Sequence, residues 1–488
     1  MKWNRECVSR IFSIAWRVSI LLLPWQARWF VEGSSINGFP WEAGRISIYA
    51  SWVPMAVTIV CSFLLIRFRH SVPLCRPGRN EVEIRDSGLR REDRGKARLT
   101  GAKWIPLFFG VVLFSSSLFT LSSLATFQWW LQVLLLGLFV WSLRRERISS
   151  RTLAFWFVLS IVPHALLGIW QYAAQFVYGT KWLGIATQDP LVRGVSVVEV
   201  AGARVLRAYG GFPHPNIFGA WLAIGLLVAM RTFVEEITKY KRWFFAGALV
   251  LFTIALVLTF SRTAWIAGVV GIGGMIGTWG FSRRKPSPSL PYQGGGQKDP
   301  QNPSLIKEGQ GWISEKRSLF VPLLFILLSL LPTLFFTRHI LFTRLSATAR
   351  LENISINERE VAMKQGWQLF LQHPWFGVGP NATELALSRM SGARKDAPMT
   401  PPHFVPLLIL DEVGVVGAFG ILCLIIYSVW HFCRKAERLS LNWLSFFLPI
   451  LIFCALDHFL WSYWAGMGLV AMTLIIVGKN MDALHEGD

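Results

Sequence analysis

Long apolar runs are the feature of this sequence that most limits its fold. The chain has 488 residues, of which 53% are hydrophobic and only 16% are charged, and its mean hydropathy is +0.44. Soluble domains carry about 25% charged residues, and about 20 consecutive apolar residues suffice for a helix to cross a bilayer. The runs are too many and too long for the core of a soluble protein. We therefore expect an all-α polytopic membrane protein.

Twelve runs are long enough to predict membrane-spanning helices. Their approximate bounds are 11–25, 46–66, 104–122, 126–143, 152–173, 213–230, 243–260, 263–281, 318–336, 404–430, 441–459 and 461–478. Arg17 interrupts the first run, and its long side chain must reach the membrane interface. An even number of crossings places both termini on the same side of the membrane.

Basic loops indicate which side that is. The segment 67–103 holds eleven Lys and Arg residues against five acids. Further basic stretches begin at Arg144, Arg231, Ser282 and Cys433, and all of them fall on the same side as 67–103. Short loops rich in Lys and Arg stay in the cytoplasm, so both termini are expected to be cytoplasmic. These loops also account for much of the net charge of +21, and nucleic acid is not an expected partner.

Two longer segments are then external, at about 174–212 and 337–403. The second holds eight Lys and Arg residues against five acids, which opposes the orientation bias and indicates a functional reason for the charge. It also contains apolar residues at helical spacing, namely Val361, Met363, Trp367, Leu369 and Phe370. This spacing predicts an amphipathic helix near the outer membrane surface.

The chain is expected to have three parts. Residues 1–200 would form the N-terminal membrane helices, 201–430 a core with the external loop 337–403, and 431–488 a C-terminal hairpin. The stretch 284–312 within the core is rich in Pro, Gly, Ser and Gln and has no apolar pattern. Such a composition is typical of a disordered linker, which here would be cytoplasmic.

Four basic side chains at the predicted external face are candidates for chemistry: Arg207, Arg262, Arg359 and His403. Arginine stays charged and pairs with phosphate oxygens at two points, so several arginines at one face can bind a diphosphate and stabilise it as a leaving group. Histidine exchanges protons near neutral pH. The alternatives are that Arg262 is only an interfacial anchor and that His403 only begins a helix.

Ionisable residues also fall inside predicted spans. Asp411 and Glu412 lie in the span 404–430, and Asp457 and His458 in the span 441–459. Such residues mark functional sites or buried structural pairs. We take Glu412 and Asp457 as supporting residues. No Asp-rich or His/Cys cluster has the spacing of a metal site, so no metal or cofactor is expected.

Four motifs give the sequence a resemblance to a known family. They are RAYGGFPHPNIFGAWLA from Arg207, TFSRTAWIAG from Thr259, the stretch from Arg359 through HPWFGVGPN, and HFVPLLILDEVGVVG from His403. In this order they resemble the O-antigen ligase and polymerase-like family of bacterial membrane glycan transferases. The resemblance covers about 200–420.

The resemblance implies a metal-independent, inverting transferase of the GT-C-like helical class in the bacterial cytoplasmic membrane. The donor would be a glycan linked to undecaprenyl diphosphate, and the acceptor a lipid, glycan or protein hydroxyl. Arg207, Arg262 and Arg359 match arginines that would bind the diphosphate, and His403 matches a histidine that would act near the acceptor. Phe404 stands where the family usually has Asn. Ligases and polymerases differ in the acceptor, and both remain open.

The alternative function is a membrane transporter of a small solute or a lipid-linked substrate. A transporter would predict an internal repeat and polar groups near the bilayer midplane. No inverted repeat is evident, and the candidate charges gather at one face.

Overall fold

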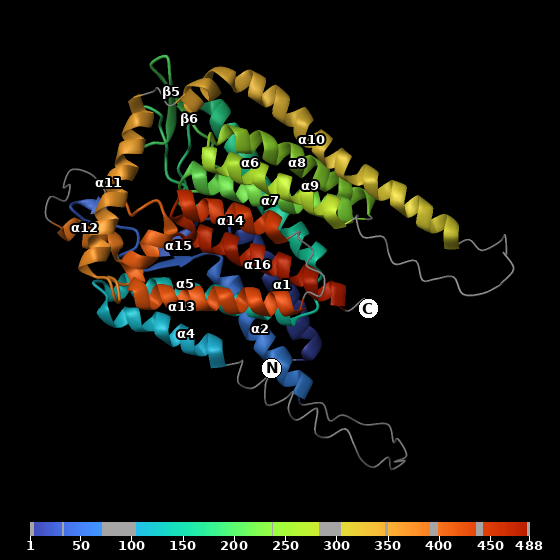
Figure 1. Cartoon of the computed structure of the whole chain (residues 1–488), viewed down its shortest axis with the longest axis horizontal. Coiled ribbons are helices and arrows are strands. Elements are labelled where there is room, and N and C mark those ends of the chain that lie inside the picture. The colour runs from blue at the N-terminus through green and yellow to red at the C-terminus, as the bar shows by residue number, and fades with distance from the viewer. Residues whose placement is uncertain are drawn as a thin grey trace, which may run out of the picture.

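A computed structural model describes residues 4–31, 34–70, 104–236, 238–282, 304–346, 350–390, 399–435 and 443–485. The described chain is mostly helical (Figure 1). Six of its helices are long and apolar enough to cross a membrane. The chain is therefore a largely α-helical polytopic membrane protein, as the apolar runs predict. Most of the basic segment 67–103 lies outside the described residues.

Each of the twelve predicted spans coincides with a helix. These helices are α1 (Arg5–Leu22), α2 (Trp52–His70), α4 (Trp104–Ser115), α5 (Ser123–Arg145), α6 (Ser150–Ala174), α7 (Pro215–Glu235), α8 (Lys239–Leu258), α9 (Arg262–Ser282), α10 (Ser304–Ser346), α13 (Val405–Lys435), α14 (Leu444–Leu456) and α16 (Trp464–His485). A 3-10 turn, Ser116–Phe119, follows α4.

Helix α7 is the centre of the bundle. It packs against α6, α8 and α9, and 89% of its most apolar stretch of 18 residues is buried. A helix that is apolar on all sides needs neighbours or lipid on all sides. The first turn of this helix carries Asn216, so the most enclosed helix brings a polar group to one end of the bundle.

Shorter elements cover that end of the bundle. Helix α11 (Arg350–Gln372) crosses the ends of the long helices, and β5 (Val197–Val200) pairs with β6 (Ala203–Leu206) beside it (Figure 1). Helices α12 (Thr383–Arg389) and α15 (Phe459–Ser462) lie at the same end. The segment between α1 and α2 adds two small hairpins, in which β1 (Arg28–Phe30) pairs with β4 (Ser47–Tyr49) and β2 (Ser35–Ile36) with β3 (Phe39–Pro40). We call this end the capped end.

The all-α class is confirmed, since the described chain is mostly helical and its three small sheets, each of two strands, lie at the capped end. Two expected bounds change. Helix α10 continues to Ser346, into the predicted loop 337–403. Residues 284–303 of the predicted linker 284–312 lie outside the described residues, and α10 already begins at Ser304.

Asp457 and His458 do not lie inside a helix. Asp457 ends α14, and His458 precedes α15, so both residues occupy the turn that leads to α16. The sequence from 441 to 478 is apolar almost throughout, which is why the position of this turn was not evident. The turn lies at the capped end (Figure 1).

Candidate active site

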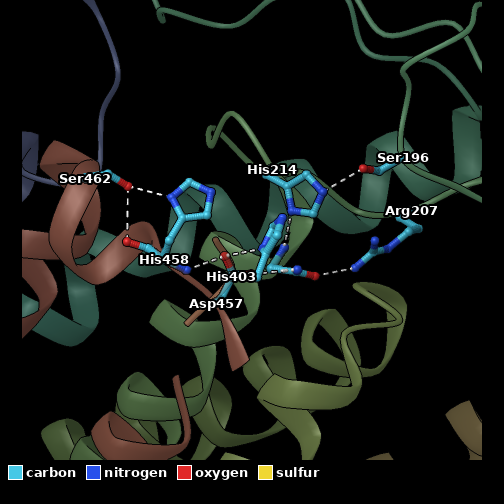
Figure 2. A network of polar contacts seen from close by, with 8 residues as sticks. Ser196, Arg207, His214, His403, Asp457, His458 and Ser462 are labelled. Atoms are coloured by element: carbon cyan, nitrogen blue, oxygen red, sulfur yellow. Dashed lines mark hydrogen bonds and ion pairs between the residues drawn. The ribbon is translucent and has the colours of Figure 1, made fainter. Parts of the chain in front are cut away.

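A histidine and a carboxylate form the centre of the site. His403, immediately before α13, places Nδ1 3.3 Å from Oδ1 of Asp457 (Figure 2). The same oxygen accepts the main-chain N–H of His458 at 2.8 Å. Burial alone would raise the pKa of Asp457, but the hydrogen bond to His403 and the nearby His458 hold that pKa well below its usual range. Asp457 is therefore ionised and orients the His403 ring.

An asparagine connects this pair to Arg207. Asn216 Nδ2 donates to Asp457 Oδ2 at 2.9 Å, and its Oδ1 accepts Arg207 Nη2 at 2.8 Å. Arg207 also donates from Nε to the carbonyl oxygen of Thr259 at 2.7 Å. The four residues form one chain of hydrogen bonds from the imidazole to the guanidinium (Figure 2).

Arg207 is a buried charge that has no direct counter-ion among the residues that the structure describes. It is 5% exposed, and its hydrogen-bond acceptors, an amide and a carbonyl oxygen, are neutral. Burial, followed by the nearby charge of Arg344, lowers its pKa to about 9. The guanidinium remains protonated at neutral pH, but its charge is poorly compensated. Leaving a buried charge unpaired is costly, and a bound anion would remove that cost.

Arg262 lies in a second group of charges. Its guanidinium forms an ion pair with Glu352 in the first turn of α11, and Arg344 at the end of α10 pairs with the other oxygen of the same carboxylate. Arg344 also donates to the carbonyl oxygen of Phe260 at 3.2 Å. Two arginines therefore share one acid, so this group keeps a net positive charge.

Arg359 lies inside α11 rather than at its start. It shares a helix face with Ala362, Gly366 and Leu369, which are the buried residues of this part of α11. A Cβ at Gly366 would lie 2.4 Å from Pro402 Cγ, so only glycine allows α11 to approach the residues beside His403 this closely. The predicted apolar residues Val361 and Trp367 are instead exposed. Arg359 has no hydrogen bond or ion pair within the described part of the chain, although its charge reaches Arg207.

Two further histidines flank the centre. His458 packs its ring on that of His403, with centroids 4.9 Å apart, and places Nδ1 2.7 Å from Ser462 Oγ. His214 caps α7, accepts the Asn216 N–H at Nδ1 and places Nε2 2.8 Å from Ser196 Oγ (Figure 2). Both residues hold the backbone around the His403–Asp457 pair.

Three of these side chains have the chemistry of metal ligands. One ligand atom from each of His403, Asp457 and His458 lies within 4.8 Å of the others. The sequence did not indicate this group, since His403 is 54 residues from Asp457. Both oxygens of Asp457 and Nδ1 of His458 already have hydrogen-bond partners, which favours a hydrogen-bonded network over a coordination shell.

Glu412 lies outside the His403 network. It accepts hydrogen bonds from Trp461 Nε1 at 2.6 Å and Thr383 Oγ1 at 3.2 Å. The GVG of the HPWFGVG motif packs on its backbone, where Gly379 N–H donates to the Glu412 carbonyl oxygen at 2.8 Å. Gly377 has a φ of +68°, and a Cβ there would lie 2.4 Å from Glu412 carbonyl carbon. The motif is a turn that fits against α13.

The sequence predicted Arg207, Arg262, Arg359 and His403 as site residues, and the structure places all four at the capped end. It did not single out Asn216, Arg344 or Glu352. Arg344 was visible as excess charge in the predicted external loop, and Asn216 as a polar residue at the start of a span.

Part of the chain is similar to known proteins. Residues 246–422 match the family model described as O-antigen ligase. The chain is also 27% identical, over 337 residues, to a general O-oligosaccharyltransferase of Acinetobacter baylyi (strain ATCC 33305 / BD413 / ADP1). That match covers 66% of this chain and 49% of the relative, so the chain spans about half the length of the curated relative it matches.

The chain is O-antigen ligase-like. The matched region of this O-antigen ligase-like protein includes Arg262, Arg359 and His403. Arg207 precedes the region and Asp457 follows it. Arg207 and Asp457 therefore join the site from parts of the chain outside the matched region.

Proposed function

We propose that this protein transfers a glycan from an undecaprenyl-diphosphate carrier to an acceptor hydroxyl. In one displacement, the acceptor oxygen would bond to the anomeric carbon while the bond from that carbon to the diphosphate breaks. The diphosphate leaves with the electron pair, and the anomeric configuration inverts. The enzyme would be a GT-C-like, metal-independent glycan ligase or polymerase.

Uncompensated positive charge at the capped end is the observation that carries the proposal. Arg207, Arg262, Arg344 and Arg359 contribute four positive charges, and Glu352 neutralises one. A diphosphate matches both the charge and the two-point geometry of guanidinium groups. Charge fixed in place before the reaction stabilises the leaving group without reorganisation.

His403 is positioned to act as the base. When the Nδ1–H of His403 donates its hydrogen bond to Asp457, the lone pair of the ring lies on Nε2, where it can accept the proton of the acceptor hydroxyl. Asp457 then stabilises the imidazolium that forms. His403 is 25% exposed at its side chain and Asp457 only 7%, so the base is accessible while its partner is enclosed.

We also propose that all twelve helices cross the bacterial cytoplasmic membrane, with the capped end external and both termini cytoplasmic. The charge asymmetry of the loops supports this orientation. The lipid part of the donor would lie in the membrane while its diphosphate reaches the arginines at the interface.

The decisive experiment replaces Arg359 by lysine. Lysine keeps the charge but loses the two-point geometry, so Arg359→Lys should transfer glycan at least about 10-fold more slowly and raise the KM for the lipid-linked donor. Arg350→Lys is the matched control, because Arg350 lies on the same helix with a 71% exposed side chain. Equal rates for the two variants, at equal yields of monodisperse protein, would refute diphosphate binding by Arg359.

A further inference from the structure

A polar hollow lies next to the His403 network. It consists of two adjoining cavities, of about 60 and 220 Å³. Both are lined by Glu42, Glu384, Pro401, His458 and Tyr463. The walls come from the α1–α2 segment, α5, α12, α13, the residues just before His403 and the turn before α16, none of which carries Arg207, Arg262, Arg344 or Arg359. Arg28 and Arg45 of the α1–α2 segment also line the smaller cavity.

Buried polar atoms face this hollow without protein partners. Ser47 Oγ, Gln128 Oε1 and Gln132 Oε1 have no hydrogen-bond partner within the described ranges. Their residues are 2%, 3% and 5% exposed, and all three line the smaller cavity. Buried polar atoms are nearly always hydrogen-bonded in folded proteins. Three such atoms around one cavity therefore make its walls polar and suit hydrogen-bonding groups of water or of a ligand.

The lining identifies the chemistry of that ligand. Amide, hydroxyl and carboxyl groups accompany the aromatic rings of Trp41 and Tyr463. Burial, followed by the charges of Glu42 and Glu412, raises the pKa of Glu384 to about 8. A protonated Glu384 both donates and accepts hydrogen bonds, as an amide does. A sugar has many hydroxyl groups that do the same and apolar ring faces that suit aromatic side chains.

The hollow and Arg207 lie on different sides of the base. His458 lines both cavities and packs on the His403 ring. In Figure 2, His458 and Ser462 lie on one side of His403 and Arg207 on the other. An in-line displacement needs the nucleophile opposite the leaving group. We propose that the polar hollow is the acceptor site and that it binds a saccharide, one hydroxyl group of which reaches past His458 to His403, which deprotonates it.

This inference rests on the proposed function, and kinetics can separate the two substrates. Gln132→Leu and Glu384→Leu should each raise the KM for the acceptor by about 3- to 10-fold, as expected for one lost hydrogen bond, and leave the KM for the donor unchanged. The matched control is Gln26→Leu. Gln26 is 8% exposed, donates to the carbonyl oxygen of Pro24 and lines neither cavity.

The acceptor pools are the phenol-extracted glycolipid of the host cell and its delipidated envelope protein. Each is mixed with purified enzyme and labelled lipid-linked donor, and the label is expected in the glycolipid. Label in the protein pool would overturn the saccharide assignment in favour of a polypeptide acceptor. A raised donor KM with a constant acceptor KM would place the donor glycan in the hollow. Unchanged constants in both hollow variants would also overturn the inference.

A binding measurement keeps the inference distinct from the proposed function. Tryptophan fluorescence is titrated with the saccharide released from the same glycolipid, since Trp41 lines the larger cavity. Suppose that Gln132→Leu weakens saccharide binding but the parent protein has no transferase activity: the acceptor site would then be supported and the transferase function refuted. If the parent protein transfers glycan but Gln132→Leu leaves saccharide binding unchanged, the transferase function would be supported and the acceptor site refuted.

Discussion

Asp457→Asn should slow glycan transfer while leaving the donor bound. Three donors point at the Asp457 carboxylate: His403 Nδ1, Asn216 Nδ2 and the His458 main-chain N–H. A charge-assisted hydrogen bond contributes about 1.5–3 kcal/mol. Losing the one to the imidazolium should therefore lower kcat by about 10- to 150-fold.

The same substitution should also reduce stability. The amide of an asparagine has a single acceptor oxygen. If that oxygen faces His403, its NH₂ group faces the NH₂ group of Asn216, and one buried donor is left without an acceptor. Such a donor costs about 1–3 kcal/mol, which should appear as a lower melting temperature in detergent.

A double variant separates the hydrogen-bond pattern from the charge. In Asn216→Asp with Asp457→Asn, the carboxylate at 216 accepts from Arg207 and from the new amide, whose oxygen still faces His403. Stability should recover, but kcat should not, because the negative charge has moved away from the imidazole. The assay is transfer from lipid-linked donor per milligram of monodisperse protein. A parental kcat for Asp457→Asn, or a kcat restored in the double variant, would refute the electrostatic role of Asp457.

Three further predictions test other parts of the argument. Gly366→Ala places a Cβ 2.4 Å from Pro402 Cγ, so it should cost about 1–3 kcal/mol of stability and displace Arg359. The control is Gly247→Ala, whose Cβ has no atom within 4 Å and which should leave activity unchanged. Equal transfer activities of the two variants would show that the Gly366–Pro402 contact does not position Arg359. In intact cells with a cysteine-free background, Asn357→Cys should react with a membrane-impermeant maleimide. Tyr240→Cys should not react, although the Tyr240 side chain is 86% exposed in the parent protein. The opposite labelling pattern would show that the topology is inverted. EDTA should leave transfer unchanged because the Asp457 oxygens are already hydrogen-bonded; loss of activity with rescue by a divalent ion would assign a metal to His403, Asp457 and His458.

The sequence by itself determined that this is a membrane protein and where its helices lie. Run length and apolar character are local properties, so each of the twelve predicted spans coincides with a helix. The arginine and histidine candidates were also accessible from the sequence, because charges that oppose the orientation bias stand out against apolar surroundings.

Only the tertiary structure decided which of these residues act together. Arg262 is 90 residues from Glu352, and His403 is 54 residues from Asp457, so no local pattern could pair them. The turn at Asp457 was hidden within an apolar stretch, and the buried face of α11 is set by the small residues Ala362 and Gly366 rather than by its largest apolar ones. The polar hollow is lined by the α1–α2 segment together with α5, α12 and the turn before α16, which are far apart in the sequence. Contacts between distant segments are fixed by the packing of the whole bundle, and that packing is what makes a site from scattered residues.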